Sequence, residues 1–278
     1  MMRALWTAAS GMTSQQTNVD VIANNLSNIN TVGYKSESAQ FKTLLYQTIQ
    51  SKTTSANGER KPVGAQVGLG TRNAAITTDF TQGSLTQTDI TTDFAIDGKG
   101  FFAIQNIDGE TVYTRDGSFN WAMGSDESVM LCNSQGYPVL DTDGLTIELP
   151  VHPAEGEKYN TSLITIDADG YVCYPDEYNN PQPLGPQIGI VQFSNPGGLE
   201  KSSGSTYKMT EASGEPIMEV YTDNIKKSKI RQGFLEASNV QTVDEMVNLI
   251  VAQRAYEMNS KAIQSADEML GQANQLKR

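Results

Sequence analysis

The final part of the chain, residues 233–278, is the feature that most constrains the fold. From Val240 onward it contains no proline and only one glycine, Gly271. Apolar or small residues recur there in steps of three and four, so they form one stripe along a helix. These residues are Val243, Val247, Val251, Ala255, Met258, Ala262, Ala266, Met269, Ala273 and Leu276. The helix would be roughly 55 Å long. One small core cannot cover that length, so we expect a partner helix.

The start of the chain provides the expected partner. Residues 3–28 predict a helix whose apolar positions follow a heptad-like seam, interrupted by the polar pair Gln15 and Gln16. The seam consists of Leu5, Ala8, Met12, Val19, Ile22 and Leu26. We predict that the two terminal helices pack together as a coiled-coil-like pair. On periodicity alone, an ordinary helical subdomain formed by the two termini is the alternative.

Local signals indicate where these helices begin and end. Asn239 is a suitable N-terminal cap for the second helix. Asp244 and Glu245 lie in its first turns, where the helix dipole favours negative charge. The first helix should end before Gly33, in a stretch of asparagines that favours turns.

Between the helices the pattern changes to β structure. Short apolar runs predict strands at residues 101–104, 146–149, 163–166 and 188–193. Five Asp-Gly pairs favour type I′ hairpin turns, which need positive φ at both central residues. The pairs begin at Asp97, Asp108, Asp116, Asp143 and Asp169. We predict an inserted antiparallel all-β domain, in which the proline-rich stretch 175–186 is a surface loop.

The expected organisation is an α+β chain in four parts. Residues 1–36 carry the N-terminal helix, which forms one helical domain with the C-terminal helix of residues 233–278. Residues 37–70 connect that domain to the β-domain of residues 71–232. Within the connection, residues 38–50 predict a short amphipathic helix or an extended arm. The polar residues that follow, 51–64, predict an exposed loop.

The charge balance excludes some classes of function. Among 278 residues, 20 are Lys or Arg and 32 are Asp or Glu, which gives a net charge of −12. The chain therefore lacks the basic surface of a nucleic-acid-binding protein, and an anionic membrane surface would repel it. No apolar run has the length of a signal peptide or a membrane span, so we expect neither.

Residues for enzyme or metal chemistry are scarce. The one histidine, His152, has no nucleophile motif beside it, so we expect a structural role. Cys132 and Cys173 do not give zinc spacing with it; we expect buried free thiols, with a disulfide as the alternative. The stretches at Asp141 and Asp167 faintly resemble calcium loops, but hairpin turns explain them better. We predict no catalytic residue, cofactor or metal. A glycosidase-like carboxylate pair stays open, since sequence does not give the separation of carboxylates.

Motifs at the two ends of the chain resemble a known family. The stretch VIANNLSNINTVGYK, residues 21–35, resembles the N-terminal signature of the bacterial flagellar axial proteins, which build the rod and hook. The stretches LEASNV, residues 235–240, and QRAYE, residues 253–257, resemble the signature at the other end of that family. Shorter stretches between them resemble its rod members in particular: residues 44–49, 66–70, 98–102 and 113–119.

This resemblance implies a structural protein rather than an enzyme. The implied function is to polymerise through the terminal helices into the distal rod of the flagellar basal body, the drive shaft that transmits motor torque to the hook. The implied partners are further copies of the chain, proximal rod proteins and hook or hook-junction proteins at the rod ends, the flagellar type III export apparatus, and a surrounding bushing ring. The resemblance also implies export without a cleaved signal peptide, to the periplasm or cell-wall zone. The alternatives are a proximal rod subunit, or a glycan-acting enzyme or binding module carried by the β-domain.

In such a polymer, small residues let helices approach closely, and polar residues penalise wrong registers because an unpaired buried polar group is costly. The asparagines at the end of the first helix either contact neighbouring subunits or serve local caps and turns. Arg254 and Glu257 either fix the register between subunits or pair on one helix. The predicted interface residues are Leu5, Met12, Val19, Ile22, Asn24, Asn25, Leu26, Asn28, Val247, Val251, Arg254, Ala255, Tyr256, Met258, Asn259, Ala262 and Met269.

Overall fold

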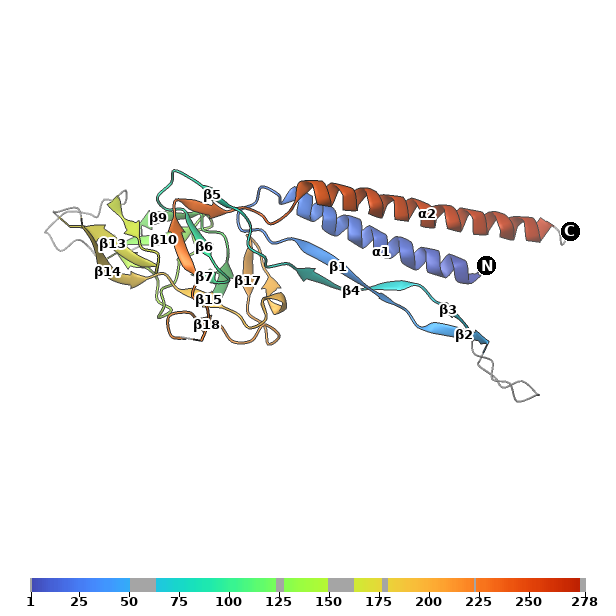
Figure 1. Cartoon of the computed structure of the whole chain (residues 1–278), viewed down its shortest axis with the longest axis horizontal. Helices are drawn as coiled ribbons and strands as arrows, with labels where there is room; N and C mark the ends of the chain where they lie inside the picture. Colours follow the sequence, from blue (N-terminus) through green and yellow to red (C-terminus); the bar gives the residue numbers. More distant parts are fainter. Residues whose placement is uncertain are drawn as a thin grey trace. The chain divides into compact units, whose positions relative to one another are not determined.

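The structure is a computed structural model that describes residues 2–50, 64–123, 128–149, 163–176, 180–222 and 224–275. The chain runs from a helix through a mostly β middle to a second helix (Figure 1). It divides into two compact units. The helix unit comprises Met1–Ser27, Glu37–Thr78 and Gln241–Arg278, and the β unit comprises Asn28–Ser36 and Asp79–Val240. The predicted order of helix, β structure and helix is confirmed.

In the helix unit, α1 and α2 lie side by side and run in opposite directions (Figure 1). Four strands form two antiparallel pairs, β1 with β4 and β2 with β3. The first pair packs against α1, where Asn73 Nδ2 donates to Thr17 Oγ1 over 2.6 Å. Residues 38–50 are thus extended, which was one of the two predicted alternatives for this stretch. The elements are α1 (Met2–Ser27), β1 (Glu37–Thr43), β2 (Tyr46–Gln50), β3 (Ala65–Gly68), β4 (Thr71–Thr78) and α2 (Thr242–Gln275).

The β unit is built from short antiparallel strands. Its largest sheet has 6 strands in the order β16-β17-β8-β7-β15-β18. Smaller sheets have the orders β11-β10-β9 and β12-β13-β14, and two further pairs are β19-β6 and β20-β5. The strands are β5 (Leu85–Gln87), β6 (Phe94–Asp97), β7 (Phe101–Gln105), β8 (Thr111–Thr114), β9 (Phe119–Met123), β10 (Val129–Asn133), β11 (Glu148–Leu149), β12 (Thr165–Ile166), β13 (Tyr171–Pro175), β14 (Pro181–Gln187), β15 (Ile190–Gln192), β16 (Glu200–Lys201), β17 (Thr206–Lys208), β18 (Ile217–Met218), β19 (Lys229–Gln232) and β20 (Phe234–Glu236).

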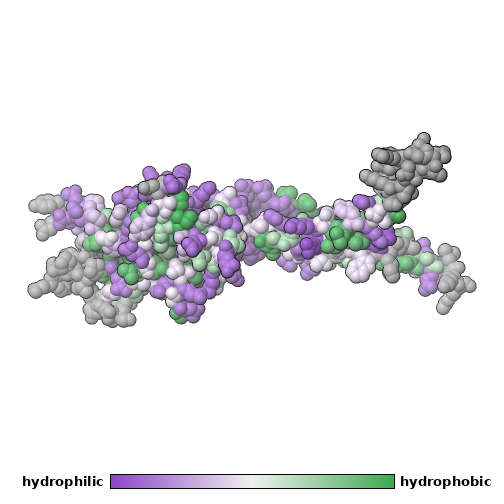
Figure 2. All heavy atoms as spheres, turned by 90° about the horizontal axis from the view of Figure 1, so that it is seen from below, coloured by the Kyte–Doolittle hydropathy of each residue, from purple (hydrophilic) through white to green (hydrophobic). Residues whose placement is uncertain are grey.

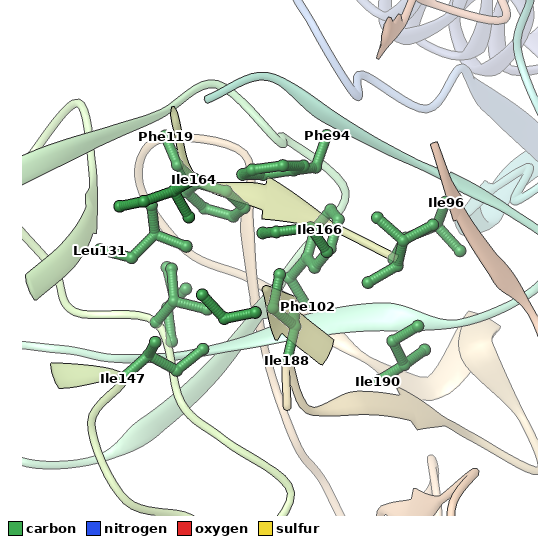
Figure 3. Close-up of a cluster of buried hydrophobic side chains, with 14 of the residues drawn as sticks. Phe94, Ile96, Phe102, Phe119, Leu131, Ile147, Ile164, Ile166, Ile188 and Ile190 are labelled. Carbon is green, nitrogen blue, oxygen red and sulfur yellow. The ribbon is translucent and has the colours of Figure 1, made fainter. Parts of the chain in front are cut away.

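Strand β7 is the centre of the β unit because both of its faces are covered. Phe102 and Ile104 point into one buried cluster, together with Phe94, Phe119 and other side chains (Figure 3). The alternate residues Phe101 and Ala103 belong to a second cluster. A strand buried on both faces reads as a continuous apolar run rather than an alternating one. Burial on both faces therefore explains the apolar run at residues 101–104, from which β7 was predicted.

One turn recurs four times in the β unit and replaces the predicted type I′ turn. In each copy the glycine N–H donates to the residue three positions back, and that residue donates to the one after the glycine. Glycine alone takes positive φ there, as in a type I turn followed by a G1 bulge. The four glycines are Gly109, Gly136, Gly144 and Gly170. The type I′ prediction is therefore wrong, although turns at three of the five Asp-Gly pairs are confirmed.

Of the other local predictions, some are wrong and one is confirmed. The proline-rich stretch 175–186 was expected to be a loop, but Pro181–Gln187 forms strand β14. This strand lies at a sheet edge, where a missing proline N–H is tolerated. Asn239 does not cap α2, which begins at Thr242; its side chain binds Ser36 and Asp79 instead. Cys132 and Cys173 are buried free thiols, as predicted. His152 and most of the loop 51–64 lie outside the described residues.

The central position of β7 predicts the effect of truncating it. Phe102→Ala should lower the free energy of unfolding of the β unit by about 3–5 kcal/mol, because a fully buried ring leaves a cavity. Ile107→Ala, at a side chain that is 84% exposed, is the control and should change it by less than about 0.5 kcal/mol. Urea unfolding measures both. Similar losses for the two variants would contradict the assignment of β7 as the core strand.

Candidate functional site: the helix pair and a buried ionic cluster

The side of α2 that faces α1 is not the stripe predicted from the sequence. Of the 34 residues of α2, two are buried, Ala252 and Ala266. The half-buried residues Leu249, Asn259 and Ile263 share their side of the helix. These five positions keep to the a and d spacing of a heptad, which stays on one side of a helix in a pair. The predicted stripe began with three steps of four, which drift around the helix, so most of it points elsewhere.

The two helices approach closely where α1 has a glycine. A Cβ atom added at Gly11 would lie 2.9 Å from Asn259 Nδ2 on α2. Ala8 on α1 and Ala252 on α2 are also buried. Of the predicted interface residues, Ile22 is buried, whereas Leu5, Met12, Val19, Leu26, Ala255 and Asn259 are half-buried. The seam thus combines larger apolar side chains with glycine and alanine, and the small residues permit the close approach.

Asn25 holds the end of α1 to its neighbours in the helix unit. Its side chain is buried, and it bonds the backbone of Glu37 twice: Nδ2 donates to the carbonyl over 2.8 Å, and Oδ1 accepts from the N–H over 2.9 Å. Nδ2 also lies 3.3 Å from Glu245 Oε1 at the start of α2. Burial raises the pKa of the Glu245 carboxyl above its ordinary value. Asn25 therefore has the local role that was one of the two alternatives.

Most of the other predicted interface residues lie on the surface. Of these, Val247, Val251, Met258 and Met269 are at least half exposed, and so is Val243 of the predicted stripe, at 73%. We call these five residues the outer stripe of α2. Figure 2 shows one face of the molecule, with hydrophobic residues among hydrophilic ones. Asn24, Arg254, Tyr256 and Ala262 are exposed as well, and Arg254 pairs with Glu257 on the same helix over 2.9 Å.

A groove also lies between the two helices. It has a volume of about 430 Å³ and is lined by Gln16 and Val19 of α1 and by Gln253, Tyr256 and Glu257 of α2. Its lining combines an apolar floor with amide, phenol and carboxylate groups. Such a lining offers both packing and hydrogen bonds to a side chain that enters it.

The β unit contains a buried ionic cluster centred on Glu236. Glu236 Oε1 accepts from Lys35 Nζ over 2.5 Å and from the Gly83 N–H over 2.9 Å. Glu236 Oε2 accepts from Arg115 Nη1 over 3.0 Å. The side chains of Lys35 and Glu236 are fully buried, and that of Arg115 is 2% exposed. We call Lys35, Arg115 and Glu236 the ionic cluster.

Each cation of the ionic cluster has a further hydrogen bond, although Arg115 Nε is buried without a partner. Lys35 Nζ donates to the Thr81 carbonyl over 2.8 Å, and Arg115 Nη2 donates to the Gly98 carbonyl over 2.7 Å. The guanidinium also lies 5.1 Å from the centre of the Phe101 ring. Burial lowers the pKa of both the Lys35 ammonium and the Arg115 guanidinium, and the Glu236 carboxylate opposes that effect. The cluster holds two buried positive charges against one negative charge.

All three residues of the ionic cluster lie in motifs identified from the sequence, but their contact with one another was not predicted. Lys35 ends the N-terminal motif, Glu236 is the second residue of the C-terminal one, and Arg115 lies in the stretch 113–119. A charged residue within each of three separate motifs was the available signal. Among the described residues no group of three or more His, Cys, Asp or Glu could hold a metal ion. None of the helices in the described part of the chain is long and apolar enough to cross a membrane.

Comparison with known proteins identifies the family to which this chain belongs. Three family models match: "Flagella basal body rod protein" over residues 5–35, "Flagellar hook protein FlgE/F/G D1 domain" over 95–174, and "Flagellar basal body rod FlgEFG protein C-terminal" over 231–276. The flagellar basal-body rod protein FlgG of Borreliella burgdorferi is 48% identical, with 100% of both chains covered. The chain belongs to the family of flagellar basal-body rod proteins.

Other relatives agree with this family. FlgG of Caulobacter vibrioides is 41% identical over 99% of this chain and 100% of its own. Among solved structures, the flagellar hook protein FlgE2 of Helicobacter pylori matches 63% of this chain and 47% of its own, at 16% identity and a TM-score of 0.23, too low to compare the folds. Like other members of the rod protein family, the chain is a structural basal-body component, as the sequence predicted, and not an enzyme.

The contrast between two neighbouring asparagines tests the local role in the rod protein. Asn25→Ala should destabilise the helix unit by about 1–3 kcal/mol, because it leaves the backbone polar groups of Glu37 without their partner. Asn24→Ala, at the exposed neighbouring position, is the control and should cost less than Asn25→Ala, because water reaches the groups that it leaves. Hydrogen exchange of the amides in β1 and at the end of α1 measures the difference. Equal protection in the two variants would contradict the assignment.

Proposed function

We propose that the chain polymerises through its terminal helices into the distal rod, the drive shaft that transmits motor torque to the hook. The outer stripe of α2 and the groove between the helices would contact neighbouring subunits. The observation that carries this proposal is the burial of α2: a helix of 34 residues buries two alanines and leaves valines and methionines exposed. Exposed apolar patches of this kind mark sites of protein association.

The geometry of such contacts favours an open polymer over a closed dimer. The outer stripe and the groove are different surfaces, so a neighbour that inserts one into the other makes a heterologous contact. Heterologous contacts that do not close generate helical filaments. Each exposed valine or methionine that becomes buried would contribute about 1.5–3 kcal/mol. Val19 and Tyr256, two of the predicted interface residues, line the groove.

The distribution of charge supports assembly through the helix unit. That unit has 8 acidic and 10 basic residues, whereas the β unit has 24 acidic and 10 basic residues. The net charge of −12 thus arises in the β unit, while the helix unit as a whole is nearly neutral. In a polymer the β units would repel one another, which keeps free subunits apart until the helices engage.

The same proposal includes partners beyond the chain itself. The ends of the polymer would meet proximal rod proteins and hook or hook-junction proteins, and a bushing ring would surround it. The subunits would reach the periplasm or cell-wall zone through the flagellar type III export apparatus, without a cleaved signal peptide. Membership of the rod protein family supports these partners, since each neighbours the rod in such an assembly.

A pair of charge-adding substitutions tests the proposed interface. Val251→Glu places a charge in the outer stripe and should raise the concentration needed for assembly by about tenfold or more, since burial of an unpaired charge is unfavourable. Gln264→Glu adds the same charge about 140° away around α2, at another exposed position, and should have little effect. Sedimentation and electron microscopy over a concentration series measure assembly. If both variants polymerise like the unaltered chain, the stripe is not the interface.

The charge distribution predicts the direction of the salt effect. Raising the ionic strength from about 10 mM to about 150 mM shortens the screening length from roughly 30 Å to roughly 8 Å. Repulsion between the β units should then weaken, so assembly should begin at a lower protein concentration. Light scattering in a salt series measures this onset. Assembly that weakens as salt is added would show that ion pairs, and not apolar contacts, hold the subunits together.

A further inference from the structure

The chain passes between the helix unit and the β unit four times. The crossings follow Ser27, Ser36, Thr78 and Val240. Any load that the helix unit transmits along the chain therefore enters the β unit at three segments: residues 28–36, 79–83 and 233–240. The contacts that these segments make inside the β unit resist their separation from it.

Glu236 lies in the third of these segments and contacts the other two. Its carboxylate accepts from Lys35 in the first segment and from the Gly83 N–H in the second. Its own backbone carbonyl, in the third segment, accepts from the Gly33 N–H over 2.8 Å. The second carboxylate oxygen binds Arg115, which follows strand β8 of the central sheet. One residue thus ties the three segments to one another and to the sheet.

The packing around Glu236 leaves no room for the segments to slide. A Cβ atom at Gly83 would lie 2.0 Å from the Ala237 carbonyl oxygen, and one at Gly33 would lie 2.7 Å from the backbone of Arg115. Asn239 adds a second tie, because it accepts from the Ser36 N–H over 2.8 Å and donates to the Asp79 carbonyl over 2.9 Å. The backbones of Ser36 and Asp79 also bond each other over 2.8 Å.

We propose that the ionic cluster is the mechanical anchor of the β unit, which holds the three segments that connect it to the helices. The inference rests on the proposed function, because only a subunit that transmits torque carries such a load. A buried ion pair is well suited to this use. Breaking the pair leaves unpaired charges in an interior without water, which is unfavourable. The resistance to force is therefore lost in one step and is not shared among many weak contacts. An exposed pair would be screened and would yield readily.

Single-molecule pulling on the full chain tests the anchor. Two pairs of handles share Ser134: the pair Asn30 and Ser134 loads the first segment, and the pair Ser134 and Asp169 loads the β unit away from the ionic cluster. All three positions are exposed. Handles attached through unnatural amino acids avoid the native thiols, Cys132 and Cys173. The measured quantity is the unfolding rate of the β unit at constant force.

Glu236→Gln leaves both buried cations without an anion. It should speed unfolding by about a hundredfold or more when Asn30 and Ser134 are pulled, and by less than about tenfold when Ser134 and Asp169 are pulled. If this variant does not fold, Lys35→Met is measured instead. It keeps the neutral pair of Arg115 and Glu236 but removes the tie to the first segment, and should speed unfolding by about tenfold in the first geometry alone.

Glu110→Gln is the matched control. Glu110 lies within the loaded stretch and pairs with Lys208 over 2.8 Å, but its side chain is 61% exposed, so both geometries should be unaffected. Equal acceleration of both geometries by Glu236→Gln would make the cluster a general stabiliser and overturn the proposal, as would no acceleration in either. The measurement uses single subunits. A failure of polymerisation would therefore refute the proposed function without changing this result.

Discussion

A buried carboxylate is tolerated only where other groups replace the water that it loses, and Glu236 imposes this condition on the whole β unit. Its partners come from positions that are 201, 153 and 121 residues away along the chain. The β unit therefore cannot complete its fold until its first and last segments meet. This requirement brings the two ends of the inserted region together, and these ends adjoin the end of α1 and the start of α2 along the chain.

The helix unit has the opposite character, since little of it is buried. Its seam uses glycine and alanine, which allow a close approach but remove little apolar surface from water. Most of the larger apolar side chains of α2 are exposed, as is Trp6 of α1, at 74%. A pair held by such a seam is weak by itself, because helices in proteins gain most of their stability from packing an apolar face. The helix unit is thus the part of the chain that gains most from neighbours.

Local patterns predicted much of the fold, and long-range relations were missed. The apolar run at β7 and the proline-free stretch of α2 identified their elements, because periodicity depends only on nearby residues. The choice of seam on α2 failed because apolar residues occupy two sides of that helix, and only the position of α1 decides which side is covered. Asn239 looked like a cap because its type suits one, yet its partners Ser36 and Asp79 are far away in the sequence. The ionic cluster escaped for the same reason.

The two units therefore divide the physical tasks of the subunit. The β unit has a closed core, a buried ionic cluster and all of the net negative charge, so it is stable and repels other copies. The helix unit is nearly neutral and leaves its larger apolar groups uncovered. Were the acidic excess of the β unit placed in the helix unit instead, repulsion would act at the surface where contact must form. Separating charge from apolar contact lets a free subunit stay soluble and still bind its neighbours.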